Sequence, residues 1–568
     1  MTRRRRKPAE TEPSLPPLTE EDLHTGDSVC EAPEGSSLFY PWQERAVEAL
    51  EGRSAILSAP TGSGKTWVAY RWAGLMDREG NAQMPPGRVI FTAPIKALSN
   101  ERYLDLKRMG FDVGLETGDF KKNAGAEVLC CTQEIYTLKY CRVPHQRVVV
   151  DEFHYIFNDS ERTRAYIDGI RGTQPSTELL VMSATFGNPD NVKNYLQEMA
   201  RRDFVLYETK ERVTKLVFRR KGVRYAHIHD ALVFVFSKKG VDFLAQEIAK
   251  SRKKISREDR ARLREMAEIL EVRRVPEVLL RGVGVYYGSL LPKEKLLVEM
   301  AFRERILDVV VGTDALSLGV NLPAETVVFG QMAKFVDGPL TRNEFLQMSG
   351  RAGRKGFFDT GYVTFVPKSR CEHFDFDTET LYREILTASP EPARIRLRPS
   401  VGMLLRKERT PEQEARMVST CSLPPRPYPE VLQEVDDLIQ LLNRTINLVK
   451  DPKTRRRLRK ALADLWFDEM SVAANIAVAH LFLREESPEA LDVAQILRRE
   501  ERNYLQALLK VKRYANRMPE EYRLTGLEAI DEAVDALDAT VFGFEDKLRR
   551  LQVTEDSWAF EDDEAGSL

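Results

Sequence analysis

The fold of this chain is decided by the stretch Ala55-Ile56-Leu57-Ser58-Ala59-Pro60-Thr61-Gly62-Ser63-Gly64-Lys65-Thr66. An apolar strand runs into a turn with two glycines, and Lys-Thr then opens a helix. The backbone N–H groups of such a turn can surround a polyphosphate, and the helix N-terminus adds the positive end of its dipole. The pattern predicts a nucleotide-binding loop in which Lys65 contacts the β- and γ-phosphates and Thr66 contacts Mg²⁺. Ala59 stands where the general pattern has glycine, so the loop is a variant.

Length and composition describe a globular protein of several domains. The 568 residues suggest about three to four domains. Apolar residues make up 42% of the chain and charged residues 30%, while the formal net charge is only −1. A basic coat for nucleic acid is therefore excluded, and any nucleic-acid surface has to be local. Because no run approaches about eighteen apolar residues and no apolar segment follows the N-terminus, we expect a cytoplasmic protein without a membrane span.

Cysteine and histidine give no sign of a structural metal site. The six cysteines form no C-x-x-C pair and show no metal-type spacing. Cys130 and Cys131 lie in an apolar run and are expected to be reduced core residues. His227 and His229 form a His-x-His pattern without a third ligand nearby, so we interpret them as structural.

A second pattern is the acidic segment Val148-Val149-Val150-Asp151-Glu152-Phe153-His154. Two carboxylates that emerge at the end of a buried strand are costly without a cation or a reaction. If this strand neighbours the strand before the loop, Asp151 can hold the Mg²⁺ that Thr66 touches, and Glu152 can polarise an attacking water. The loop and the acidic segment together predict a site for ATP and Mg²⁺.

Further polar residues follow other apolar runs of the first half of the chain. Gln43 lies one element before the loop, and its amide can both donate to and accept from an adenine edge. Open α/β sheets bind ligands at the carboxyl ends of their strands, where hydroxyls and amides suit the phosphates of a polynucleotide. The candidate nucleic-acid contacts are Pro94, Lys96, Ser99, Asn100, Thr117, Gly118, Thr132 and Gln133. Ser183 and Thr185 end another strand and are candidates for coupling the nucleotide to the strand.

A second α/β unit begins near Ala231 and ends in the segment 347–356, Gln-Met-Ser-Gly-Arg-Ala-Gly-Arg-Lys-Gly. On a helix, Arg351 and Arg354 at positions i and i+3 would share one face. Presented to the γ-phosphate from a second lobe, they would act as arginine fingers that complete the site only when the two lobes close. The pattern thus predicts a motor in which ATP draws two lobes together.

Taken in order, these patterns resemble the Ski2-like group of superfamily 2 helicases over residues 38–366. In that superfamily an alanine at the first position of the loop is usual. The acidic segment is similar to the DEVH box of the group, with Phe in place of Val. The matching segments are 59–66 (motif I), 93–100 (motif Ia), 117–119 and 132–134 (nucleic-acid contacts), 151–154 (DEVH box), 183–185 (coupling motif), 312–323 (motif V) and 347–356 (motif VI).

The resemblance implies further roles for single residues. Gln347 and Arg351 are expected near the γ-phosphate, with Arg354 as the principal finger. Within motif V, the resemblance implies nucleotide contacts for Asp314 and Gly319 and a coupling or nucleic-acid role for Thr313. The aromatic residue that the family often places six positions before its adenine-reading glutamine is Ser37 here, so Phe39 or Tyr40 is the candidate to stack on adenine.

The expected fold class is α/β, with two tandem RecA-like parallel-sheet domains followed by a winged-helix-type module and an α-helical C-terminal bundle. The segments after the core are expected to lack the long arch insertion of exosome-associated members, because fewer than two hundred residues follow it. The predicted segments are 1–37 (disordered tail), 38–210 (ATP-binding RecA-like domain), 211–370 (second RecA-like domain), 371–427 (winged-helix-type or connector module), 428–553 (ratchet-like bundle) and 554–568 (acidic tail).

The resemblance implies an ATP-dependent RNA helicase that translocates 3′ to 5′ on a single strand and unwinds duplexes. Two alternatives stay open: a Ski2-like DNA helicase of repair, and a nucleotide-gated clamp or remodelling subunit that does not unwind. The expected partners are single-stranded RNA or DNA and a nuclease, with no membrane partner, and we expect a monomer.

Overall fold

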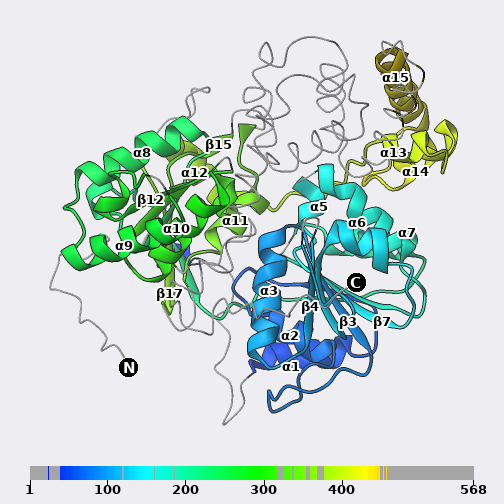
Figure 1. The fold of residues 1–568 in the computed structure, drawn as a ribbon, viewed down its shortest axis with the longest axis horizontal. Helices are drawn as coiled ribbons and strands as arrows, with labels where there is room; N and C mark the ends of the chain where they lie inside the picture. The colour runs from blue at the N-terminus through cyan, green and yellow to red at the C-terminus, as the bar shows by residue number, and fades with distance from the viewer. Residues whose placement is uncertain are drawn as a thin grey trace. The chain divides into compact units, whose positions relative to one another are not determined.

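The computed structural model describes residues 23–24, 39–117, 120–158, 160–184, 186–272, 274–288, 290–317, 322, 324–334, 338–353, 358–367 and 377–447, together with 452, 456, 459 and 463. The chain divides into two compact units, drawn in Figure 1. The first lobe holds residues 44–58, 66–208 and 392 onward, and the second lobe holds 209–391 together with 59–65 and the stretch up to Gln43. Each lobe is described by itself below.

The first lobe is built on a sheet of eight strands, and every pairing in it is parallel except that of β4 with β5. Its strands are nearly continuous apolar runs, as expected where both faces of a sheet are covered. In spatial order they are β5 (Lys121–Lys122), β4 (Val113–Glu116), β6 (Val128–Thr132), β3 (Arg88–Ala93), β7 (Gln146–Val150), β8 (Glu178–Ser183), β2 (Ala55–Ser58) and β9 (Val205–Glu208).

Helices cover both faces of this sheet (Figure 1). Successive residues of a strand point to opposite faces. Ile90 of β3 belongs to the cluster formed with α6 and α7, whereas the ring of Phe91 packs against Tyr70 of α2 at 5.7 Å. The helices of this lobe are α1 (Pro41–Leu50) from Glu44 on, α2 (Lys65–Trp72) from Thr66 on, α3 (Lys96–Arg108), α4 (Gln133–Ile135), α5 (Tyr155–Asn158), α6 (Ser160–Gly172) and α7 (Pro189–Ala200), with a π-helix at Tyr136–Tyr140.

The strand order answers a condition that the sequence left open. The acidic strand β7 is not a direct neighbour of β2, because β8 lies between them and pairs with both. Ser183 at the end of β8 is in register with Ser58 at the end of β2. The strand that carries the predicted coupling serine thus separates the two strands that lead into the predicted nucleotide residues.

The described residues from Pro392 to Asn447 pack on the first lobe. They form α13 (Val401–Leu405), α14 (Pro411–Thr420) and α15 (Tyr428–Asn447). Leu397, Val418 and Val431 are fully buried in the same cluster as Tyr166 of α6 and Leu196 of α7. The segment that holds α13 to α15 therefore extends the hydrophobic core of the first lobe.

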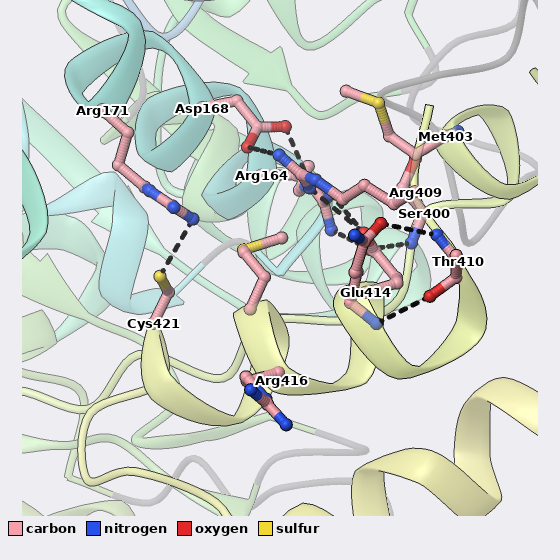
Figure 2. A network of polar contacts seen from close by, with 12 residues as sticks. Arg164, Asp168, Arg171, Ser400, Met403, Arg409, Thr410, Glu414, Arg416 and Cys421 are labelled. Atoms are coloured by element: carbon pink, nitrogen blue, oxygen red, sulfur yellow. Dashed lines mark hydrogen bonds and ion pairs between the residues drawn. The ribbon is translucent and has the colours of Figure 1, made fainter. Parts of the chain in front are cut away.

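A buried ionic network joins α6 to α14 within that packing, as Figure 2 shows. Arg164 donates through Nε to Asp168 at 2.8 Å and through Nη2 to Glu414 at 3.1 Å, and its Nη1 also bonds Glu414. The side chain of Arg164 is 2% exposed and that of Glu414 0%. Burial alone would raise the pKa of the Glu414 carboxyl, but the charge of Arg164 lowers it below its ordinary value.

The second lobe has a sheet of seven strands in which only the pairing of β1 with β10 is antiparallel. In spatial order the strands are β1 (Leu23–His24), β10 (Lys215–Phe218), β17 (Thr360–Phe365), β14 (Thr326–Phe329), β11 (Ala231–Phe234), β13 (Val309–Gly312) and β12 (Val283–Tyr286), and β15 (Ala333–Lys334) pairs with β16 (Gly338–Pro339) apart from it. β1 lies within the stretch expected to be a disordered tail.

Local sequence explains where the helices of the second lobe begin. Ser237, Ser256 and Thr341 each accept a backbone N–H of the first turn that follows, the usual way to satisfy the open donors of a helix start. One face of the sheet packs on α8, and the other carries stacked rings such as Phe329 and Phe345, 4.8 Å apart. The helices are α8 (Lys238–Lys250), α9 (Arg257–Ile269), α10 (Pro292–Arg303), α11 (Arg342–Ser349) and α12 (Thr378–Thr387).

These observations confirm the expected α/β class with two RecA-like parallel-sheet domains. They divide the predicted connector 371–427, because α12 belongs to the second lobe and the residues from 392 to the first. α15 lies at the start of the predicted helical bundle 428–553. The rest of that bundle and the predicted acidic tail lie outside the described residues, apart from single positions. In the part of the chain that the structure describes, no helix is long and apolar enough to cross a membrane.

Candidate functional site

The loop between β2 and α2 has the backbone that its glycines permit. Gly62 and Gly64 adopt φ values of +81° and +90°, a region that other residues rarely adopt. Lys65 folds back over the loop and donates from Nζ to the carbonyl of Ala59 at 2.8 Å. The hydroxyl of Ser63 is buried without a hydrogen-bond partner among the described residues. A buried unused hydroxyl and an ammonium group held by loop carbonyls fit a loop that receives a phosphate.

Gln43 of α1 is tied to this loop. Its Nε2 donates to the carbonyl of Gly64 at 3.1 Å, and its Oε1 accepts from the backbone N–H of Tyr40 at 2.9 Å. The two bonds fix the orientation of the amide, which retains one N–H and one lone pair. Phe39 and Tyr40, the candidates for stacking on adenine, have buried side chains.

The acidic segment after β7 is held from both sides. The N–H of Asp151 donates to Thr92 of β3 at 3.0 Å, and that of Phe153 donates to Met182 of β8 at 2.8 Å. Between them Glu152 has a φ of +49°, a left-handed conformation that costs a non-glycine residue about 1–3 kcal/mol. Such strain persists where the surroundings hold it, and it is concentrated at functional sites.

His154 links the acidic segment to the segment after β8. Its Nδ1 accepts from the N–H of Ala184 at 3.4 Å and lies 3.3 Å from a carboxylate oxygen of Glu152. The neighbouring hydroxyl of Ser183 is buried and has no hydrogen-bond partner within the described part of the chain. The structure therefore brings the predicted coupling serine beside the predicted catalytic segment, whereas Thr185 lies outside the described residues.

Thr66 and Asp151 meet at a residue that the sequence analysis missed. Nη2 of Arg102, on α3, lies 3.0 Å from Oδ2 of Asp151 and 3.3 Å from Oγ1 of Thr66. Its Nη1 donates to the hydroxyl of Tyr70 at 3.0 Å. Hydroxyl and carboxylate oxygens are the hard donors that Mg²⁺ prefers, so the two predicted ligands fit this metal. No local pattern marks Arg102, because its partners come from α2 and β7.

The predicted nucleic-acid contacts of the first lobe differ in accessibility. Lys96 and Asn100 at the start of α3 are partly exposed, whereas the side chains of Ser99 and Gln133 are buried. Gln133 instead accepts from Thr92 at 2.7 Å through its Oε1. The side chains of Pro94, Thr117 and Thr132 are buried as well, and Gly118 lies outside the described residues. Burial lowers the pKa of Lys96 to about 8, although Glu134 raises it.

In the second lobe the structure brings two predicted segments together. Thr313 caps a short 3₁₀ turn at Asp314–Leu316, and Arg351 donates from Nη2 to the carbonyl of Ser317 just after that turn. Gln347 lies on α11 and is partly exposed. Gly319 and Arg354 lie outside the described residues.

The helical spacing expected for the two arginines is wrong for Arg351. α11 ends at Ser349, and Arg351 lies in the turn that follows. Gly353 then adopts a φ of +71°, and a Cβ at that position would come within 2.7 Å of the backbone nitrogen of Gly361. The close approach of β17 therefore requires a turn here in place of another helical turn.

Comparisons with known proteins agree with this arrangement. The DEAD/DEAH box helicase family matches residues 40–194, and the helicase conserved C-terminal domain matches residues 225–356. The chain is 28% identical over 416 residues to the DExH-box ATP-dependent RNA helicase DExH9 of Arabidopsis thaliana, covering 58% of this chain and 41% of that protein.

Two further relatives come from distant organisms. Identity to the exosome RNA helicase MTR4 of Homo sapiens is 27% over 450 residues, which is 65% of this chain and 42% of that protein. Identity to the probable helicase HelY of Mycobacterium tuberculosis is 27% over 413 residues, which is 57% of this chain and 45% of that protein. The chain thus spans less than half the length of these relatives.

Proposed function

We propose that this chain is an ATP-dependent helicase of superfamily 2 and of its Ski2-like group, because the DEAD/DEAH box helicase family and the helicase conserved C-terminal domain match it and its relatives are helicases. It would couple hydrolysis of Mg²⁺-bound ATP to movement along single-stranded nucleic acid. The observation that carries the proposal is the edge of the first sheet, where the strained Glu152 adjoins Asp151 and the carboxylate and Thr66 share one arginine nitrogen.

Each residue at that edge has a role in the proposal. The loop 61–64 and Lys65 hold the phosphates, and Thr66 and Asp151 hold Mg²⁺, which neutralises phosphate charge when it is bound. Glu152 accepts a proton from the attacking water, and the backbone bonds of Asp151 and Phe153 hold the main chain on either side of it. His154, which contacts both Glu152 and Ala184, relays the state of this site to the coupling segment.

The second lobe contributes Gln347, Arg351 and Arg354 in the proposal. Arginine groups of this kind stabilise the charge that develops on the γ-phosphate. The bond from Arg351 to Ser317 ties this group to the segment of Thr313, so both segments respond together to bound nucleotide. Asp314 and Gly319 belong to the same proposed nucleotide contact.

We propose that the single strand is RNA and that the protein moves along it from 3′ to 5′. The support is that DExH9 and MTR4 are named as RNA helicases. A nuclease is the proposed class of partner, because MTR4 is named as an exosome RNA helicase. The proposed contacts on the first lobe are the partly exposed Lys96 and Asn100, with backbone amides serving where side chains are buried.

The test is ATP hydrolysis by the purified chain with single-stranded RNA, with single-stranded DNA of the same sequence, and with neither. We expect RNA to raise the rate most. A larger effect of DNA would favour the DNA helicase, and equal rates in all three conditions would refute a strand-driven motor. Unwinding of a duplex with a 3′ overhang separates a helicase from a clamp, because a clamp would hydrolyse ATP without separating the strands.

A further inference from the structure

Arg102 occupies a place in the first lobe that no role above explains. Its guanidinium group lies over the rings of Tyr70, at 5.5 Å, and Phe91, at 5.9 Å, and its Nη1 is anchored on the Tyr70 hydroxyl. Burial raises the pKa of that hydroxyl to about 12, so it stays protonated. The anchor leaves Nη2 directed at Thr66 and Asp151 together.

We propose that Arg102 is a positioning residue that competes with Mg²⁺ for Thr66 and Asp151 and makes this competition depend on nucleic acid bound at α3. The inference rests on the proposed function, because it takes Thr66 and Asp151 as the metal ligands and the start of α3 as a strand contact.

Competition follows from the charges. An arginine side chain keeps its proton in proteins, so Arg102 supplies a permanent positive charge to the carboxylate of Asp151. A metal ion that binds Oγ1 of Thr66 and Oδ2 of Asp151 would have to share both oxygens with the same Nη2. Two positive charges at one partly buried point repel each other strongly, so metal entry requires Nη2 to withdraw. Until then Arg102 balances Asp151 and keeps it in place.

The proposed link between Arg102 and bound nucleic acid follows from their shared helix, α3. Lys96 and Asn100, the accessible candidates for phosphate contact, lie on α3 with Arg102. Lys96 precedes Arg102 by six residues, about 9 Å along a helix axis. A helix moves as a unit on its packed face, so a phosphate that pulls on the start of α3 also shifts Arg102. A strand bound there would draw Nη2 from the metal ligands, and by reciprocity the bound metal would strengthen strand binding.

The test measures binding, with a fluorescent ADP analogue titrated into the full chain with Mg²⁺ and with EDTA. The ratio of the two dissociation constants is the enhancement by Mg²⁺. In the wild type we expect single-stranded RNA to increase this enhancement. In Arg102→Gln the enhancement should be larger without RNA by about tenfold, the effect of one charge-assisted hydrogen bond, and RNA should no longer change it. The same enhancement in variant and wild type, with and without RNA, would overturn the proposal.

Control variants separate competition from a structural effect. Arg108→Gln changes an arginine of the same helix whose side chain is 45% exposed and should match the wild type. Arg102→Gln should bind the analogue in EDTA within about twofold of the wild type, because the phosphate loop is intact. If Arg102→Gln fails to fold, Tyr70→Phe removes only the Nη1 anchor, and it has to raise the enhancement for the proposal to stand.

The same titration separates this proposal from the proposed function. A wild-type chain that does not bind the analogue, or binds it without help from Mg²⁺, would refute the assignment of the nucleotide site. Normal enhancement by Mg²⁺ in the wild type together with an unchanged Arg102→Gln would refute only the role of Arg102.

Discussion

Two arginines of the first lobe, the partly buried Arg102 and the buried Arg164, are both paired with carboxylates, yet they are held in different ways. Arg164 bonds two carboxylates, those of Asp168 and Glu414, and also the carbonyl of Arg398, with its side chain 2% exposed. Arg102 bonds one carboxylate and two hydroxyls, and its side chain is 16% exposed.

The difference lies in what else the partners are needed for. Glu414 and Asp168 have only Arg164 and the neighbouring Arg409 as charged partners in the described network, so nothing in the proposed reaction competes for them. Thr66 and Asp151 are the proposed ligands of Mg²⁺. The buried ion pairs of Arg164 therefore hold α14 on the first lobe. In contrast, Mg²⁺ can replace Arg102 at its proposed ligands Thr66 and Asp151.

The largest expected effect lies next to Arg102 and Asp151, at Glu152, the residue that follows Asp151 in the chain. Glu152→Gln should lower the rate of ATP hydrolysis by about 10²- to 10⁴-fold, the usual contribution of a general base, while the affinity for ATP stays near that of the wild type. Single-turnover hydrolysis and equilibrium binding of a fluorescent ATP analogue measure the two quantities. Hydrolysis at the wild-type rate would show that Glu152 is not the base.

The next effect concerns Arg164 and its partner Glu414. Glu414→Ala leaves Arg164 buried with Asp168 as its remaining close carboxylate, so the free energy of unfolding should fall by about 3 kcal/mol, the lower end for a broken buried pair. Urea unfolding measures it. Glu412→Ala, at an exposed position of the same helix, is the matched control and should change stability by less than about 0.5 kcal/mol. Equal effects of both substitutions would contradict the comparison.

The contribution of the Arg164–Glu414 pair to the free energy of unfolding depends on pH in a definite direction. The pKa of Glu414 is lowered below its ordinary value of 4.5 by Arg164, against the effect of burial. The pair therefore stabilises the fold fully above pH 4.5, and its contribution is lost as the pH falls through the folded pKa. The stability difference between the wild type and Glu414→Ala should be constant from about pH 8 to about pH 6 and shrink in acid. A difference that grows in acid would refute the assignment.

The smallest expected effect is at the start of α3. Burial lowers the pKa of Lys96 to about 8, with Glu134 opposing the shift, so Lys96 loses its charge as the pH rises through 8. Affinity for a single strand should fall by up to about fivefold between about pH 7 and about pH 9, the worth of one exposed phosphate contact. Fluorescence anisotropy measures it. Lys96→Arg, which stays charged, should lose this dependence, and an unchanged dependence in that variant would exclude Lys96 as its source.

Local patterns predicted a large part of this molecule. The alternation of apolar runs and helical segments indicated two α/β units, and the resemblance to superfamily 2 helicases implied a parallel sheet in each. The apolar runs before the phosphate loop, before the acidic segment and up to Ser183 are the strands β2, β7 and β8. The phosphate loop could be found because its glycines, lysine and threonine are contiguous. Such signals survive in sequence because turn geometry and helix starts depend on neighbouring residues.

Two features could not be predicted in the same way. The neighbours of β7 depend on which of several similar apolar strands pair with it, and they are β3 and β8 rather than β2. Arg351 lies beyond the end of α11, because β17 approaches Gly353 too closely for a further turn of the helix. Both depend on packing between segments that lie far apart in the chain.

By itself, then, the sequence determined the class of fold, the phosphate loop and the acidic segment, since these follow from periodicity and from residues next to one another. Only the tertiary structure decided which arginines matter. Arg102 meets Asp151 across 49 positions and Arg164 meets Glu414 across 250. Neither arginine has a local signal, because the partner of a buried charge is set by the order of strands and the docking of helices.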